Sequence, residues 1–359
     1  MNAFENLVTW RESSTSGEAI AAALDARGPE QAAADAILAP AERIVITGAG
    51  SSYYLAQVAA AAARASMGRS VIAVPLSELI LRPDGVLVGV GRPGGVARPG
   101  LEPVVIISRS GSTSEAVDVA ERMRVAGHPT VAVTCRGQSP LADRADVTLV
   151  SRAGDETAIV MTRSFASMLA LLLDVVARLG QDDALSAGLR RIPDRWAEAR
   201  AAAEVGRELG TTDWSRIVIL GGGPAQGMAA EWGLKLTETS QVATNAFEPL
   251  EFRHGPISVC EPGMLVVGLV AGPGAAEEVA VVEEAARLGA STWLIARDEG
   301  EARGTTGRLS LIGGGLHPSA RLPLLAHPGH ALALSLALTR GLDPDAPRHL
   351  DQVVILGAE

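Results

Sequence analysis

The sequence predicts an α/β fold made of two doubly wound domains, each a mostly parallel sheet flanked by helices. Two observations predict this fold. Short apolar segments alternate with helical patterns along most of the chain, which is typical of parallel sheets covered on both faces. The opening segment also recurs, because Arg43–Gly48 reads RIVITG and Arg216–Gly221 reads RIVILG. A repeat this long indicates a duplicated domain, since solenoid repeats are far shorter.

The first half of the chain is expected to hold two parts. Residues 1–40 form an N-terminal helical segment, and residues 41–185 form the first domain. A Gly- and Pro-rich stretch without periodicity, Arg82–Pro103, is expected to be a long loop. Strands are expected at Arg43–Gly48, Ser70–Val74, Pro103–Ser108, Thr130–Thr134 and Val147–Val150, and helices at Leu55–Ser66 and Ser114–Ala126.

The second domain, with a C-terminal tail, is expected over residues 186–359. The seam between the domains lies near Gly180–Asp194, which is polar and contains Pro193. The segment after the repeated strand, Ala225–Thr239, has a helical pattern. Strands are expected at Arg216–Gly221, Met264–Val270, Thr292–Ala296, Arg308–Ile312 and Gln352–Leu356.

Composition excludes several classes of protein. Of the 359 residues 47% are hydrophobic, the formal net charge is −10, and no basic run suggests a nucleic-acid partner. Two cysteines, Cys135 and Cys260, are too few for a disulfide framework. The N-terminal sequence lacks the features of a secretory signal. The stretch Met168–Val176, taken as the longest apolar helix, is too short to cross a bilayer. We therefore expect a cytoplasmic protein with no membrane partner.

A Ser-rich turn carries the strongest chemical signal. Ile106–Ala116 reads IISRSGSTSEA, an apolar strand followed by a turn at Gly111 and the start of a helix. Hydroxyls and free backbone N–H groups at a helix N-terminus suit a phosphate group. The alternative is a cap that serves only the helix, but four hydroxyls exceed what capping needs. No Gly-Lys-Ser/Thr follows, so the turn is not a Walker loop. The hydroxyl residues are Ser108, Ser110, Ser112 and Thr113.

A Gly-rich turn, Thr47–Ser52, occupies the matching position after the first strand. Its Gly48-Ala-Gly50 could suggest dinucleotide binding, but the third glycine is missing and no acidic residue clearly ends the second strand. We expect Ser52 to contact a sugar hydroxyl or the phosphate. A plain tight turn remains the alternative.

Three charged residues share one face of the helix Ala225–Thr239. Glu231, Lys235 and Glu238 are spaced four and three residues apart, and Lys235 is the only lysine among 31 basic residues. A surface salt-bridge ladder is the alternative interpretation. Against it, the helix follows a strand end where α/β sheets place their ligands, and lysine can take part in proton transfer or imine formation where arginine cannot.

Histidines complete the set of candidates. His254 precedes Gly255-Pro256 and is therefore expected in a turn, where it could act as a general acid or base, although an exposed loop histidine is the common case. Three others are interpreted as loop residues without metal-ligand spacing, so no metal is expected. They are His317, His327 and His330.

These segments together resemble the sugar isomerase (SIS) domain family. Ile106–Glu115 resembles its Ser-x-Ser-Gly-x-Thr phosphate loop, and the Leu-Lys-Leu-x-Glu and Arg-His-Gly-Pro segments match its second half. The layout resembles the isomerase half of glucosamine-fructose-6-phosphate aminotransferase. The sequence of Met161–Phe165, preceded by Glu156, is more similar to the galactosamine-6-phosphate deaminase/isomerase and fructosamine deglycase branches.

The resemblance implies a phosphorylated sugar as substrate, two SIS-type domains, no cofactor, and a homodimer with sites near the subunit interface. It implies that Glu238 moves a proton between C1 and C2 with help from Lys235, and that His254 opens the sugar ring, reaching the site from a partner subunit. The substrate- and phosphate-binding residues that it implies are Ser52, Ser108, Arg109, Ser110, Thr113, Met161 and Gln352.

The chain departs from the aminotransferase at two points, and these limit the reactions that we expect. The chain begins Met1-Asn-Ala-Phe4, and we expect no glutaminase domain with a nucleophilic cysteine. Gln352 stands where the aminotransferase has its imine-forming lysine, so an imine could form only on Lys235. We therefore expect a deaminase or ketose–aldose isomerase that works on a hexose or hexosamine 6-phosphate. A fructosamine-phosphate deglycase and a non-catalytic sugar-phosphate-binding regulator are the alternatives.

Overall fold

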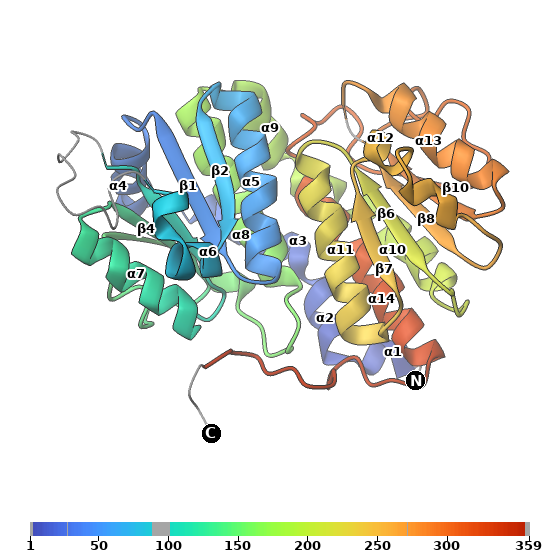
Figure 1. Cartoon of the computed structure of the whole chain (residues 1–359), viewed down its shortest axis with the longest axis horizontal. Helices are drawn as coiled ribbons and strands as arrows, with labels where there is room; N and C mark the ends of the chain where they lie inside the picture. The colour runs from blue at the N-terminus through green and yellow to red at the C-terminus, as the bar shows by residue number, and fades with distance from the viewer. Residues whose placement is uncertain (1–2, 27, 88–100, 271, 356–359) are drawn as a thin grey trace.

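The protein has two similar α/β halves that lie side by side (Figure 1). The computed structural model describes residues 3–26, 28–87, 101–270 and 272–355. The first sheet has the order β2-β1-β3-β4-β5 and the second the order β10-β9-β8-β6-β7, and neighbouring strands within them are parallel. The predicted fold class, two doubly wound sheets flanked by helices, is confirmed.

The strands of the first sheet are short and apolar, and the strands of the second sheet follow the same pattern. The first five are β1 (Arg43–Gly48), β2 (Ser70–Pro75), β3 (Val104–Ile107), β4 (Thr130–Thr134) and β5 (Val147–Val150). The others are β6 (Ile217–Gly221), β7 (Thr244–Phe247), β8 (Leu265–Leu269), β9 (Ser291–Ala296) and β10 (Arg308–Leu311). The central strands β3, β4, β6 and β8 are buried along their whole length, as expected for parallel strands covered on both faces.

Helices cover both faces of each sheet. Those of the first half are α5 (Ser51–Met67), α6 (Leu76–Leu81), η1 (Pro83–Gly85), α7 (Ser114–Ala126), η2 (Arg152–Gly154), α8 (Arg163–Gly180) and α9 (Asp183–Arg190). Those of the second are α10 (Ile192–Leu209), α11 (Pro224–Ser240), α12 (Pro249–Phe252), η3 (Pro256–Val259), α13 (Ala275–Arg287), η4 (Leu322–Leu325) and α14 (Ala326–Thr339). Helices α5 and α11 pack against each other, so the two halves share a helical interface.

The repeat is visible in the backbone as well as in the sequence. Gly50 precedes α5 with φ 54° and ψ −128°, and Gly223 precedes α11 with φ 54° and ψ −125°. The proposed boundary between residues 185 and 186 falls inside α9, and it stays a prediction.

The N-terminal segment is helical, as predicted, and divides its contacts between the two halves. Its helices are α1 (Ala3–Asn6), α2 (Val8–Ser14), α3 (Ser16–Asp25) and α4 (Pro29–Leu38). Helices α3 and α4 pack on α8 of the first half, whereas α1 and α2 pack on α14 of the second. The segment therefore bridges both halves.

Two corrections to the expected secondary structure concern strands. The segment Thr244–Phe247 is a strand that the sequence did not predict. The strand predicted at Gln352–Leu356 is wrong, because residues 352–355 have no strand structure, and Leu356 lies outside the described residues. The loop predicted at Arg82–Pro103 lies mostly outside the described residues, and its described part contains η1.

The longest apolar helical stretch differs from the one expected from the sequence and includes α14. Within the described residues, Leu322–Thr339 is long and apolar enough to cross a membrane by length and composition, so Met168–Val176 was not the longest candidate. However, 89% of that stretch is buried inside the protein, where α14 packs against α10 and α11. A buried core helix of this kind is weak evidence for a membrane span.

Candidate functional site

A pocket of about 200 Å³ brings together most of the predicted site residues. Its walls come from the turns after β1 and β3, the loop before α8, helix α11, and the C-terminal tail. The carboxyl ends of parallel strands are the usual place for a ligand in such sheets. The predicted residues that line it are Ser52, Ser108, Arg109, Ser110, Thr113, Met161, Lys235, Glu238 and Gln352.

The Ser-rich turn after β3 has the geometry of an anion cradle. Gly111 has φ 63°, and a Cβ at this position would lie 2.1 Å from Oγ of Ser139, so only glycine fits. Thr113 is the N-cap residue of α7, yet within this described segment its hydroxyl makes no capping bond. It lies instead 3.2 Å from Oγ of Ser108. The hydroxyls are therefore not accounted for by helix capping.

One hydroxyl of the predicted group does not reach the pocket. Ser112 is not among the lining residues, and its hydroxyl donates to the carbonyl of Ser110 at 3.4 Å. Ser51, which the sequence analysis did not single out, does line the pocket. Its only signal was its place beside Ser52 at the start of a helix. The Ser52 hydroxyl lies 3.9 Å from Sδ of Met161, across the pocket.

The charged residues of α11 form a buried group. Nζ of Lys235 lies 2.5 Å from Oε2 of Glu238 and 3.6 Å from Oε1 of Glu231. The side chains of Lys235 and Glu231 are 3% and 1% exposed, so the surface-ladder interpretation is wrong. Glu238 is 19% exposed and lines the pocket, whereas Glu231 does not line it.

Burial and charge together set the protonation of this group. Burial raises the pKa of Glu231 to about 8, although Lys235 and a hydrogen bond from Ser51 act against the shift. Burial lowers the pKa of Lys235, but the carboxylates of Glu231 and Glu238 outweigh it, and the net direction is upward. Lys235 is therefore held as an ammonium ion.

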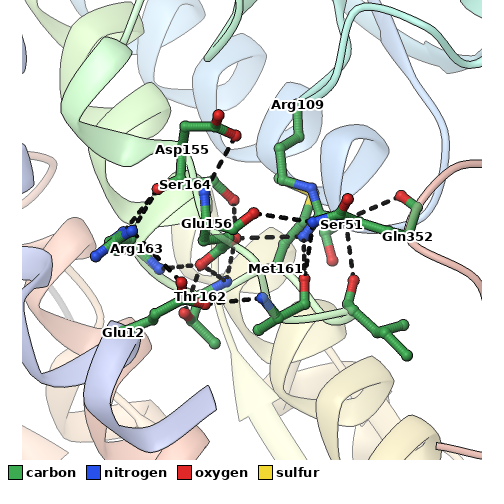
Figure 2. A network of polar contacts seen from close by, with 12 residues as sticks. Glu12, Ser51, Arg109, Asp155, Glu156, Met161, Thr162, Arg163, Ser164 and Gln352 are labelled. Atoms are coloured by element: carbon green, nitrogen blue, oxygen red, sulfur yellow. Dashed lines mark hydrogen bonds and ion pairs between the residues drawn. The ribbon is translucent and has the colours of Figure 1, made fainter. Parts of the chain in front are cut away.

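Arg109 lines the pocket, but its guanidinium contacts other groups of the protein. Its Nη1 donates to the carbonyl of Ala158 at 3.0 Å and lies 3.5 Å from Oε1 of Glu156 (Figure 2). Its Nη2 donates to the carbonyls of Ile159 and Gln352 at 3.0 and 2.9 Å. The guanidinium thus contacts the loop before α8 and the tail, which weakens the prediction that it binds phosphate.

The C-terminal tail closes one side of the pocket. The side-chain amide of Gln352 donates to the carbonyl of Glu156 at 2.9 Å, so its nitrogen also contacts the loop. The carbonyl of Val354 accepts from the backbone N–H of Ser114 at 3.2 Å, at the first turn of α7. Leu350, Asp351, Gln352 and Val354 line the pocket.

The structure does not place His254 in this pocket. The residue lies in a turn, as predicted, but it is exposed and is not among the residues that line the pocket of its own chain. Two other histidines need a correction. His327 and His330 are not loop residues, because both are buried in α14 and both rings share hydrogen bonds of 2.8 Å with the Ser13 hydroxyl. His317 does lie in a loop.

Comparison with known protein families identifies both halves. The model described as "SIS domain" matches residues 101–177 and 211–304, which include the cradle, the charged face of α11 and His254. The chain belongs to the SIS domain family. The resemblance stated from the sequence is therefore confirmed.

Two curated relatives cover much of this SIS domain protein. The glutamine–fructose-6-phosphate aminotransferase (isomerizing) of Aeropyrum pernix is 30% identical over 89% of this chain and 52% of its own length. A candidate D-galactosamine-6-phosphate deaminase of Streptomyces coelicolor is 33% identical over 65% of this chain and 62% of its own. The chain thus spans about half the length of the first relative and less than two thirds of the second.

Solved structures show the same fold. The tagatose-6-phosphate ketose/aldose isomerase of Escherichia coli matches 100% of this chain and 98% of its own, with a TM-score of 0.83 at 24% identity. The C-terminal domain of glucosamine-fructose-6-phosphate aminotransferase from Francisella tularensis matches 95% of this chain and 99% of its own, with a TM-score of 0.82 at 18% identity. At these identities the likeness concerns the fold alone.

Proposed function

We propose that this SIS domain protein is an isomerase or deaminase of a hexose or hexosamine 6-phosphate. The observation that carries the proposal is the pocket itself, in which a hydroxyl cradle from the first half faces a carboxylate and an ammonium from the second. Relatives named for deamination and isomerisation of sugar phosphates support the substrate class.

In this proposal the cradle holds the phosphate group. Its donors are neutral, since both cations that line the pocket, Arg109 and Lys235, lie beside carboxylates. Hydroxyls at the start of α7, together with the field of the helix N-terminus, can hold an anion without a free basic side chain. A fixed phosphate keeps the sugar chain in register with the reacting carbons.

Glu238 is the proposed base. It is the carboxylate of the α11 group that reaches the pocket, so it can move a proton between C1 and C2 of an open-chain sugar. Lys235 lies 2.5 Å away and would keep Glu238 oriented and stabilise the negative charge that develops on the sugar oxygen. An enediol-type intermediate needs no covalent bond to the enzyme.

The charge state of Lys235 supports this non-covalent route. An imine forms from a neutral amine. The acidic neighbours Glu231 and Glu238 raise the pKa of Lys235, so its amine stays protonated. We propose that His254 opens the sugar ring from a second subunit, because the turn that carries it lies outside the pocket of its own chain.

A ligand screen followed by one assay tests the function. Thermal shift with hexose and hexosamine 6-phosphates should identify ligands that raise Tm, while the unphosphorylated sugars should have little effect. Ammonia release from the stabilising hexosamine phosphate indicates a deaminase, and aldose–ketose exchange without ammonia indicates an isomerase. Stabilisation without any turnover would contradict the enzyme and favour the sugar-phosphate-binding regulator.

A further inference from the structure

The loop between η2 and α8 forms one wall of the pocket through Ile159, Val160 and Met161. Residues 155–162 have no helix or strand of their own. Backbone N–H and C=O groups in such a segment still need partners, because an unpaired buried group is costly. The position of this wall therefore depends on the groups that bind the loop backbone.

One set of partners lies within the first half. Glu156 is buried, and its carboxylate accepts from the N–H of Thr162 at 2.9 Å and from that of Arg163 at 3.1 Å, as well as from the Ser164 hydroxyl. Arg109 donates to the carbonyls of Ala158 and Ile159. These contacts fix both the start of α8 and the middle of the loop.

Another partner comes from the N-terminal segment, far away in sequence. Glu12 on α2 accepts from the N–H groups of Thr157 and Ala158, both at 2.8 Å, and from the Thr157 hydroxyl at 3.0 Å. Its Oε1 also lies 3.5 Å from Nη2 of Arg163. Figure 2 shows Glu12 approaching the loop from the side opposite Arg109 and Gln352. Glu12 itself does not line the pocket.

These bonds require a carboxylate. Each oxygen of Glu12 accepts from a different backbone N–H, with Oε1 bound to Thr157 and Oε2 bound to Ala158. A glutamine at this position would have the same size, but its amide nitrogen would face one of those N–H donors and could not accept from it. Arg163 also forms an ion pair of 3.5 Å with Oε1 of Glu12.

We propose that Glu12 is a positioning residue for the substrate pocket, acting through the loop that it binds. The N-terminal segment, which bridges the two halves, would thereby set the distance between the wall at Ile159–Met161 and the cradle after β3. The proposal rests on the proposed function only in taking this pocket as the sugar-phosphate site. Nothing in the local sequence around Glu12 points to this role.

Glu283 provides a matched control. It is also a glutamate on a helix, it is 9% exposed like Glu12, and it accepts from the N–H and hydroxyl of one threonine, Thr306, at 2.9 and 2.7 Å. It lies on α13 and does not line the pocket. E283Q therefore makes the same change of side chain at a different loop, where the Thr306 hydroxyl can accept from the new amide nitrogen.

Hydrogen exchange of the backbone amides tests the contact without reference to any ligand. In E12Q, exchange at Thr157 and Ala158 should be at least about tenfold faster than in the wild type, because local opening costs less free energy. In E283Q those amides should exchange at the wild-type rate. Unchanged exchange at Thr157 and Ala158 in E12Q would overturn the proposal.

Kinetics with galactosamine 6-phosphate and fructose 6-phosphate test the effect on the pocket. A displaced wall raises KM, whereas a simple loss of folded protein lowers the apparent kcat and leaves KM unchanged. We expect KM for the substrate that is turned over to rise about tenfold in E12Q and to be unchanged in E283Q, since small displacements in a site have large kinetic effects. Faster loop exchange with normal KM would refute the positioning role. If the wild type turns over none of the hexose and hexosamine 6-phosphates in the screen, the proposed function fails, and the exchange result alone decides whether Glu12 holds the wall.

Discussion

Ser51 and Glu231 join the two halves of the chain through a hydrogen bond of 3.1 Å from the serine hydroxyl to Oε1 of the carboxylate. The serine begins α5 and the glutamate lies on α11, so the bond crosses the interface between these helices. It is buried, and it places a group from the first half in direct contact with the charged residues beside the pocket. The protonation of Glu231 is therefore coupled to how the halves pack.

We predict that Glu231 makes stability depend on pH. Its pKa is about 8 in the folded protein and 4.5 as the unperturbed value, so between these values the folded state binds the extra proton. The stabilisation is complete below about pH 4.5 and is lost as pH rises towards 8, by at most about 1.4 kcal/mol per pH unit. The free energy of unfolding, measured by urea denaturation from pH 5 to 9, should fall with pH in the wild type relative to E231Q up to about pH 8. Above pH 8 the curves of the two proteins should run parallel. Parallel curves throughout would contradict this prediction.

Ser51→Ala provides a companion test. The Ser51 hydroxyl donates to the carboxylate and so favours the charged form of Glu231, which lowers its pKa. Removing the hydroxyl should raise the pKa of Glu231, so the pH range over which stability is lost should extend above 8. Lys235 does not interfere, because its pKa is raised from an ordinary value of 10.5, above the range of the measurement. If this pH range ended at a lower pH in the variant, the bond would not stabilise the charged form of Glu231.

The buried strands were predicted from the sequence because burial on both faces produces continuous apolar runs. Arg43–Gly48 and Thr130–Thr134 are buried in this way and have the predicted bounds. Strand β7 was missed because it is a half-exposed edge strand with the sequence TNAF, which lacks the apolar signal. The tail was mistaken for a strand because Val353–Leu356 is apolar, yet Val354 and Ile355 are exposed.

The parts of the candidate site that were predicted are those whose residues lie close together in the sequence. The cradle and the charged face of α11 each depend on residues within one turn or one helix, so spacing alone revealed them. The partners of Arg109 and Glu12 lie elsewhere in the chain, which no local pattern can show. His327 was placed in a loop because Pro328 and Gly329 follow it. Pro328 falls in the first turn of α14, where a missing N–H is tolerated, and Gly329 lets the helix pack against Trp232.

Glu238→Gln should abolish most turnover while leaving ligand affinity nearly unchanged. The substitution removes the proposed base but keeps the shape of the side chain, and general base catalysis contributes about 10²–10⁴ to the rate. The kcat for the substrate found in the screen should fall by that factor, while the ligand-induced change in Tm should match the wild type. E277Q, an exposed glutamate on α13, serves as the control. Normal turnover in E238Q would show that the base is another group.

The cradle can be tested by the preference for phosphate. The double variant Ser110→Ala, Thr113→Ala removes two hydroxyls that line the pocket, and a hydrogen bond to a charged group contributes about 1.5–3 kcal/mol. The KM for the hexose 6-phosphate should rise about 100-fold or more, while KM for the unphosphorylated sugar should change little. Ser112→Ala, whose hydroxyl lies outside the pocket, should behave as wild type. An equal rise for both sugars would reject the cradle.

Glu156→Ala should strongly destabilise the protein. The carboxylate is 0% exposed and accepts hydrogen bonds from Thr162, Arg163 and Ser164, and its loss would leave the charge of Arg109 buried without its partner. Breaking such a buried pair costs about 3–5 kcal/mol. Denaturant unfolding should show this as a lower midpoint. Asp118→Ala, which breaks an exposed pair with Arg122, should leave the midpoint almost unchanged.

Mixing two inactive variants tests whether His254 acts from a partner subunit. If Glu238 and His254 of one site come from different chains, a dimer of one E238Q chain and one H254N chain contains one site with both wild-type residues and one site with neither. Random exchange makes about half of the dimers mixed, so activity should recover to about a quarter of the wild-type value. Each variant alone should stay inactive, and gel filtration of the mixture should show dimers. Full activity of H254N alone would mean that His254 takes no part in the reaction. If both variants are inactive, a mixture that remained inactive while subunits exchanged would mean that Glu238 and His254 of one site do not come from different chains.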